Sequence, residues 1–130
     1  MKRLKIVFLV PFVVLFCISG CAPLVVGGAA VTAGAGTYIF MNGDLRTDYH
    51  YPYDTVWSAC ERTMADMKAV EVVPVKEIGN GTIDAVIDNE KVRISVKYKA
   101  KDLTSVSVRV GMVGDRLASQ RIHDTIVQNL

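Results

Sequence analysis

Residues 91–99, KVRISVKYK, and residues 103–113, LTSVSVRVGMV, carry the pattern that decides the fold. In both segments apolar residues occupy every second position, which is typical of strands with one face in a core and the other in water. Residues 100–102 predict a turn, so the two strands form an antiparallel hairpin. The residues expected to point inward are Val92, Ile94, Val96, Tyr98, Val106, Val108, Val110 and Met112.

The outward positions of the first strand form a basic row, which continues into the turn at Lys101. Such a row could meet an anionic surface, such as lipid headgroups or cell-wall acids. It could equally be a solvated strand face, where charge discourages edge-to-edge aggregation. The outward residues are Lys91, Arg93, Ser95, Lys97 and Lys99.

Further strands are predicted on the N-terminal side of this hairpin. Residues 82–88 follow the turn Gly79-Asn80-Gly81, and residues 70–77 contain Pro74, which indicates an edge strand or an irregularity. Leu45 to Tyr51 alternates with polar residues as a half-buried strand, ended by Pro52.

Two segments have helical spacing. One begins near Asp54, the expected N-cap, and places Cys60 on an apolar stripe that predicts its burial. The other covers residues 116–130, with Leu117, Ile122, Ile126 and Leu130 on one stripe. The expected fold class is therefore α+β, an antiparallel sheet of about five strands with two helices packed on one face.

The N-terminus has the features of a signal peptide. Lys2, Arg3 and Lys5 precede an unbroken apolar run over residues 6–18, which is too short to span a bilayer comfortably. Residues 1–20 carry three basic and no acidic residues, so their removal turns the formal charge of +2 into −1. The charge balance therefore gives no support to nucleic-acid binding.

The leader ends in Ile18-Ser19-Gly20-Cys21, which resembles the lipobox of bacterial lipoproteins. The resemblance implies cleavage between Gly20 and Cys21 and lipid attachment to the Cys21 thiol. Two or three acyl chains would anchor the protein to membrane lipid effectively permanently. Ala22 stands where aspartate commonly retains lipoproteins at the inner membrane, so the resemblance favours the outer membrane, facing the periplasm.

The expected domains are a signal peptide over 1–20, a lipid-anchored segment over 21–43, and an α+β domain over 44–130. Residues 24–41 are apolar and rich in glycine and alanine, and two interpretations stay open. Small residues every fourth position favour a helix that packs closely on another helix. Alternatively, Asn42-Gly43 is a hairpin turn, and the preceding glycines form a tether.

No catalytic or metal-binding constellation is recognisable, and no cofactor is expected. His50 and His123 are the only histidines, and neither neighbours a cysteine or carboxylate at ligand spacing. Gly111-x-x-Gly114 is too short for a phosphate loop and is more typical of a strand end.

Several segments together resemble a family of small bacterial lipoproteins of unknown function, the domain-of-unknown-function family numbered 3568. They are the leader, residues 21–30 (CAPLVVGGAA), 37–45 (TYIFMNGDL), 51–57 (YPYDTVW) and 110–115 (VGMVGD). The resemblance covers nearly the whole chain and implies no activity. The order of elements is also similar to that of helix-grip domains, an architectural likeness only.

The sequence thus predicts a membrane-anchored lipoprotein of the cell envelope with a non-catalytic binding or structural role. Its partner would be an envelope protein or a second copy of the chain. The alternative is a small-ligand carrier or an enzyme whose site one sequence does not reveal.

Overall fold

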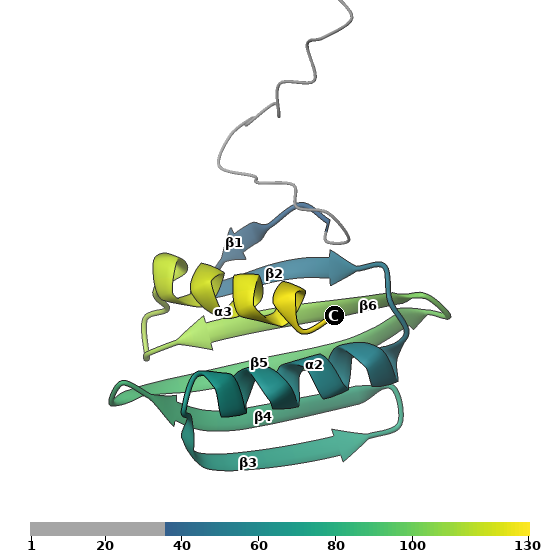
Figure 1. The fold of residues 1–130 in the computed structure, drawn as a ribbon. Coiled ribbons are helices and arrows are strands. Elements are labelled where there is room, and N and C mark those ends of the chain that lie inside the picture. The colour runs from purple at the N-terminus through teal and green to yellow at the C-terminus, as the bar shows by residue number, and fades with distance from the viewer. Residues whose placement is uncertain (1–35) are drawn as a thin grey trace, which may run out of the picture.

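The computed structural model describes residues 36–130. They form one antiparallel sheet in the order β1-β2-β6-β5-β4-β3, and both helices pack on the same face of it (Figure 1). The α+β class and the placement of the helices agree with the prediction, but the sheet has six strands because residues 39–41 add an outer one. The elements are β1 (Ile39–Met41), β2 (Asp44–Tyr49), α2 (Tyr53–Asp66), β3 (Val70–Glu77), β4 (Asn80–Ile87), β5 (Glu90–Ala100), β6 (Leu103–Val110) and α3 (Arg116–Gln128).

A tight turn joins β1 to β2. Asn42 and Gly43 have φ angles of 54° and 88°, the left-handed conformation that a two-residue hairpin turn requires at both positions. The sheet therefore starts before residue 44, and the helical interpretation of residues 24–41 is wrong for residues 39–41. Residues 24–35 lie outside the described part of the chain.

The core lies between the helices and the apolar face of the sheet. The inward residues of the central strands are buried as the alternation predicts, and Cys60 on α2 is fully buried. Gly81 on β4 leaves room for the Trp57 ring, which a side chain at this position would meet. The main sheet residues in the core are Ile83, Ile94, Val96, Val106 and Val108.

Three residues expected in the core lie outside it. Met112 is 89% exposed because β6 ends at Val110 and Gly111, with a φ of 73°, turns the chain out of the strand. Tyr98 is 51% exposed, near a register shift in the β5–β6 hairpin, which extends beyond the helices (Figure 1). Leu117 is exposed because the buried stripe of α3 runs instead through Ser119, Ile122, His123 and Ile126.

The N-cap expected at Asp54 is also wrong. Pro52 occupies the cap position of α2, and Asp54 lies in the first turn, where its carboxylate pairs with Lys76 at 2.8 Å. Proline suits a helix start because its φ is fixed near the helical value and its missing N–H loses no helical bond. In α3 a true cap is present, since the Asp115 side chain accepts a hydrogen bond from the Ala118 N–H.

Strand β3 forms one edge of the sheet, as Pro74 indicated, and its pairing with β4 shifts register between Val70 and Val73. Strand β1 forms the other edge. Within residues 36–130, neither helix has the length and hydropathy needed to cross a bilayer.

Candidate interaction surface

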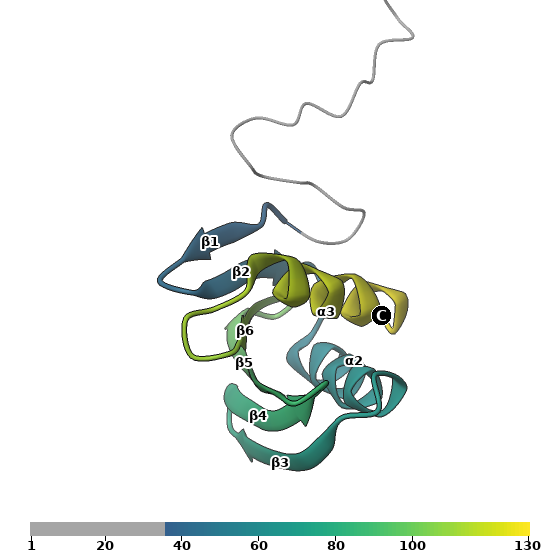
Figure 2. The same ribbon diagram turned by 90° about the vertical axis from the view of Figure 1, so that its left-hand side faces the viewer.

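The sheet face opposite the helices is polar on its central strands and carries exposed apolar side chains on the edge strands β1 and β3. No described element covers it (Figure 2). We call it the open face. Because side chains alternate along a strand, the outward half of every strand contributes to it. On strands β2, β6 and β5 its residues are Asp44, Arg46 and Asp48 of β2, Ser105, Ser107 and Arg109 of β6, and Lys91, Arg93, Ser95, Lys97 and Lys99 of β5.

Strand register places short side chains at the middle of the open face. Arg46 pairs with Ser107, which pairs with Ser95, and Ser105 of the adjacent row pairs with Lys97. Long cationic side chains and the Asp44 carboxylate surround these three serines, and the difference in length leaves a hollow of about 280 Å³. The hollow therefore presents hydroxyl groups at its floor and mainly positive charge at its rim.

Two of the cations on the open face are paired. Arg93 bonds Asp84 on β4 at 2.6 Å, and Lys99 bonds Asp48 at 2.9 Å. Burial would raise the pKa of Asp48, but hydrogen bonds from Lys99 and Ser105 outweigh it, so the pKa is lowered. Both pairs are solvent-exposed and contribute little to stability.

Other cations have no carboxylate partner. Arg46, Lys91 and Lys97 form no ion pair with any residue between 36 and 130. Arg46 and Lys97 both line the serine hollow. The predicted basic row thus exists, but only part of it is available to an external anion.

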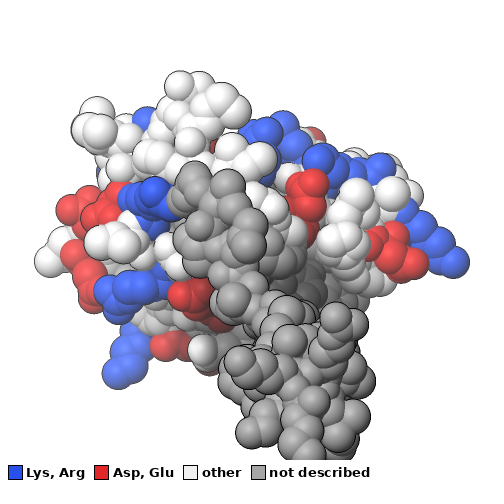
Figure 3. Space-filling view, turned by 90° about the horizontal axis from the view of Figure 1, so that it is seen from above, with Lys and Arg blue, Asp and Glu red and all other residues white. Residues whose placement is uncertain are grey.

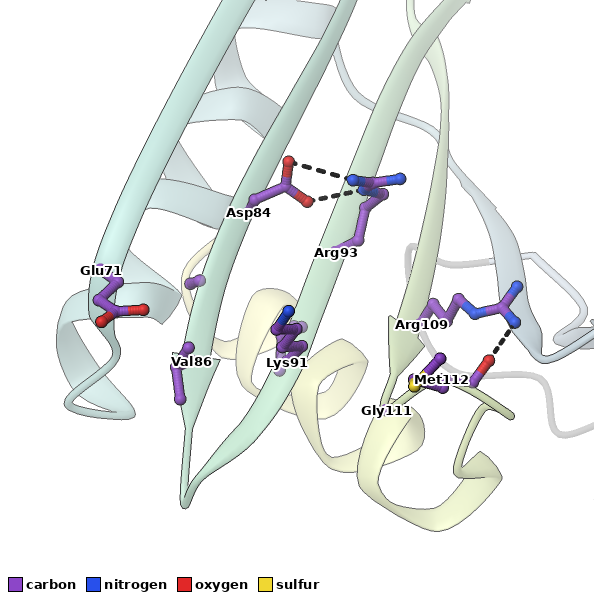
Figure 4. A pocket seen from close by; sticks show the side chains of 10 residues that line it. Glu71, Asp84, Val86, Lys91, Arg93, Arg109, Gly111 and Met112 are labelled. Carbon is purple, nitrogen blue, oxygen red and sulfur yellow. Dashed lines mark hydrogen bonds and ion pairs between the residues drawn. The ribbon is translucent and has the colours of Figure 1, made fainter.

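A second hollow, of about 390 Å³, lies at the end of the open face near the β4–β5 turn. Figure 4 shows Lys91 and the Arg93–Asp84 pair at this hollow, with Glu71 across from them. Arg109 lies on the side of this hollow opposite Glu71. Its guanidinium donates hydrogen bonds to the backbone carbonyl oxygens of Asn42 and Met112. Arg109 therefore braces the β1–β2 turn against the loop before α3.

The strongly shifted titratable groups lie in the core, away from both hollows. Burial raises the pKa of Cys60 to about 12, and it raises that of Tyr49 as well. Burial also lowers the pKa of His123 to about 4. These shifts reflect packing, because none of the three groups lines either hollow.

The sequence pattern did not identify His123 as a core residue, but the structure buries it. Its Nε2 lies 2.8 Å from the Leu45 carbonyl oxygen, and its Nδ1 lies 2.7 Å from the Tyr49 hydroxyl. A carbonyl only accepts, so Nε2 carries the proton, and the Tyr49 hydroxyl donates to Nδ1. The ring is thereby fixed as a neutral tautomer with both nitrogens bonded. Its position three residues before Ile126 was the available signal.

The sequence predicted site residues only at the N-terminus, and it assigned no role to the two histidines. Gly20 and Cys21, at the expected cleavage and lipid-attachment site, lie outside residues 36–130 and have no structural description. His50 and His123 lie apart, the first exposed and the second in the core. No group of three or more His, Cys, Asp or Glu side chains among the described residues could hold a metal ion.

The geometry defines a class of protein: a small α+β domain with its helices on one sheet face and an opposite face whose central strands are polar and mainly basic. The chain belongs to the family described as "Protein of unknown function (DUF3568)", whose model matches residues 3–129. No curated protein matches the chain significantly.

Proposed function

We propose that the protein is a lipoprotein of the cell envelope, cleaved before Cys21 and anchored to a membrane by acyl chains on that cysteine. The leader, the aliphatic-small-small-cysteine pattern and the position of Ala22 support this proposal, with the outer membrane as the expected location. The family model matches residues 3–129, so the match spans most of the leader together with the domain.

We further propose that the domain is a non-catalytic binding module that uses its open face. The observation that carries this is the serine hollow with Arg46 and Lys97 at its rim, free of ion pairs within the described chain. Unpaired cations around hydroxyl groups fit carboxylate or phosphate groups of an envelope partner, because charged donors make the stronger hydrogen bonds.

The alternative of a small-ligand carrier rests on the second hollow. Its volume of about 390 Å³ falls within the usual range for small-molecule sites. However, the Arg93–Asp84 pair already occupies part of its wall and Arg109 is bonded to backbone carbonyls, which leaves Lys91 as the cation there without either kind of bond. We therefore prefer the binding module.

The anchor is tested by changing Cys21 to Ser in cells supplied with a fatty-acid analogue. Without the thiol no thioether to the lipid can form, so the variant should stay an unprocessed precursor and take up no label. The Cys60→Ser variant is the matched control and should be labelled like the wild type, since Cys60 is buried in the core. Equal labelling of the Cys21→Ser variant would contradict the proposed anchor.

The binding surface is tested by charge reversal. Partners are captured by cross-linking in membranes, once with Arg46→Glu and Lys97→Glu together and once with Arg62→Glu and Lys68→Glu. Arg62 and Lys68 are exposed at α2 and its C-terminal end, away from the open face. We expect the open-face pair to lose the captured partner and the α2 pair to retain it. The same capture by both variants would rule out the open face.

A further inference from the structure

Exposed apolar side chains gather where the β1–β2 hairpin meets the loop between β6 and α3, and one of them, Met112, also lines the second hollow. Ile39 and Met41 of β1 are 53% and 60% exposed, and Met112, Val113 and Leu117 are 89%, 87% and 75% exposed. We call these five residues the apolar corner. From above, uncharged side chains project on the β1 side, and lysine and arginine side chains follow along the open-face side (Figure 3). Large exposed apolar groups in one place mark a contact surface.

The apolar corner has a fixed backbone, because the β1–β2 turn and the loop before α3 are bonded and packed against each other. Arg109 donates hydrogen bonds to the carbonyl oxygens of Asn42 and Met112, one on each segment. Gly43 and Gly114 pack backbone to backbone so closely that a Cβ on either would collide with the other segment. The exposed side chains are therefore held in place on the folded domain.

The way the chain enters the sheet favours a membrane as the occupant. The described chain enters along the β1 edge, where the Gly36 N–H bonds the Asp48 carbonyl oxygen at 2.6 Å. Cys21 lies only 15 residues before Gly36, and 15 extended residues span at most about 50 Å. An acylated Cys21 would thus join the domain to the bilayer through the β1 edge and not through the β3 edge. Arg46, the cross-strand neighbour of Ile39, forms no ion pair with any residue between 36 and 130, so positive charge lies beside the corner.

We propose that the apolar corner inserts into the interfacial layer of the bilayer that holds the lipid anchor. The inference rests on the proposed anchor at Cys21. Insertion would hold the β1 edge of the domain on the membrane. It would act as a second membrane attachment beside the lipid, and two attachments together hold a protein stably at the bilayer. The open face would then stand beside the membrane surface and remain accessible to a partner.

The test uses acylated full-chain protein in vesicles of phosphatidylethanolamine and phosphatidylglycerol. An environment-sensitive fluorophore is attached at Met112→Cys, or at Ile78→Cys as the matched control. Ile78 is fully exposed, but it follows β3 at the opposite edge of the sheet. Cys60 stays unlabelled because it is fully buried. Lipids carrying a nitroxide near the headgroup should quench the Met112 probe several-fold more than the Ile78 probe.

The outcomes separate the two claims. Equal quenching at both positions in acylated, vesicle-bound protein would overturn the insertion and leave the anchor intact. A spectral shift at Met112 without nitroxide quenching would mean that protein covers the corner, and would also overturn it. Failure to obtain acylated protein on vesicles would overturn the anchor and the inference together. As a second variant, Val113→Asp should lower the quenching of a probe at Leu117→Cys, whereas Ile78→Asp should not.

Discussion

The imidazole of His123 lies in the core between β2 and α3, where burial lowers its pKa from 6.5 to about 4. The unfolded chain therefore binds a proton that the folded protein does not, and stability falls as the pH falls through this window. We expect the free energy of unfolding to drop by about 2 kcal/mol between about pH 7 and pH 5. Urea denaturation at the two pH values measures this drop.

The control for this pH dependence is the other histidine. His50 is exposed, so the His50→Ala variant should keep the full drop. The His123→Asn variant should be less stable at about pH 7 but should lose most of the drop. An unchanged pH dependence in His123→Asn would show that the folded protein does not hold His123 neutral.

Cys60 gives a second prediction for a single residue. The side chain is fully buried, and burial raises the pKa of its thiol to about 12, so the reactive thiolate is scarce as well as inaccessible. In the mature protein a thiol reagent should modify Cys60 at least a hundredfold more slowly in the native state than in urea. Rapid native modification would instead indicate a reactive thiol.

At the residue scale, sequence predicted the burial of Cys60, whereas for His123 the spacing to Ile126 was a local signal but its bonding partners had none. Cysteine on an apolar stripe is usually buried, so spacing sufficed. Histidine is buried only where its nitrogens find partners, and here they are Tyr49 and Leu45, 74 and 78 residues away in sequence. No local pattern reports such distant partners.

At the element scale, the hairpin turn before β2 is the most sensitive point. Gly43 has a φ of 88°, and a Cβ there would collide with the Val113 carbonyl. Gly43→Ala should therefore lower the free energy of unfolding by more than about 1 kcal/mol. Gly79→Ala is the matched control, since its φ of 70° is equally left-handed but a Cβ would make only an ordinary contact. Equal losses in thermal or urea unfolding would show that the β1–β2 turn is not locked against the loop.

Alternation predicted the middles of the strands better than their ends. Val92, Ile94 and Val96 are buried as expected, because period-two spacing fixes the face of each residue. Tyr98 and Met112 continue the same spacing but lie beyond the helical cover or beyond the end of the strand. The position where a strand ends depends on tertiary packing, which the spacing does not contain.

At the scale of the whole molecule, the two faces of the sheet have different roles. One face packs against the helices and forms the core, and the other carries the serine hollow and cations without ion-pair partners. The basic row was visible in sequence, but two other features of the open face were not: Arg109 bonds backbone carbonyls, and serines from β5 and β6 meet at the centre. Both depend on pairing between strands and between loops, which one sequence does not specify.

The proposed arrangement places the lipid anchor, the apolar corner and the open face in order from the membrane outward. The anchor is the central claim, because both the docking and the accessibility of the open face depend on it. In this arrangement the domain is held at the bilayer by its β1 edge, with β3 as the edge farthest from the membrane across the sheet.

The most direct measurement is the mass of the N-terminal tryptic peptide of protein purified from membranes. The first basic residue after Cys21 is Arg46, so the mature protein should give a peptide over residues 21–46 that carries the mass of two or three acyl chains. Recovery instead of an unmodified peptide over residues 6–46, with Cys17 and Cys21 both free, would contradict cleavage and lipid attachment together.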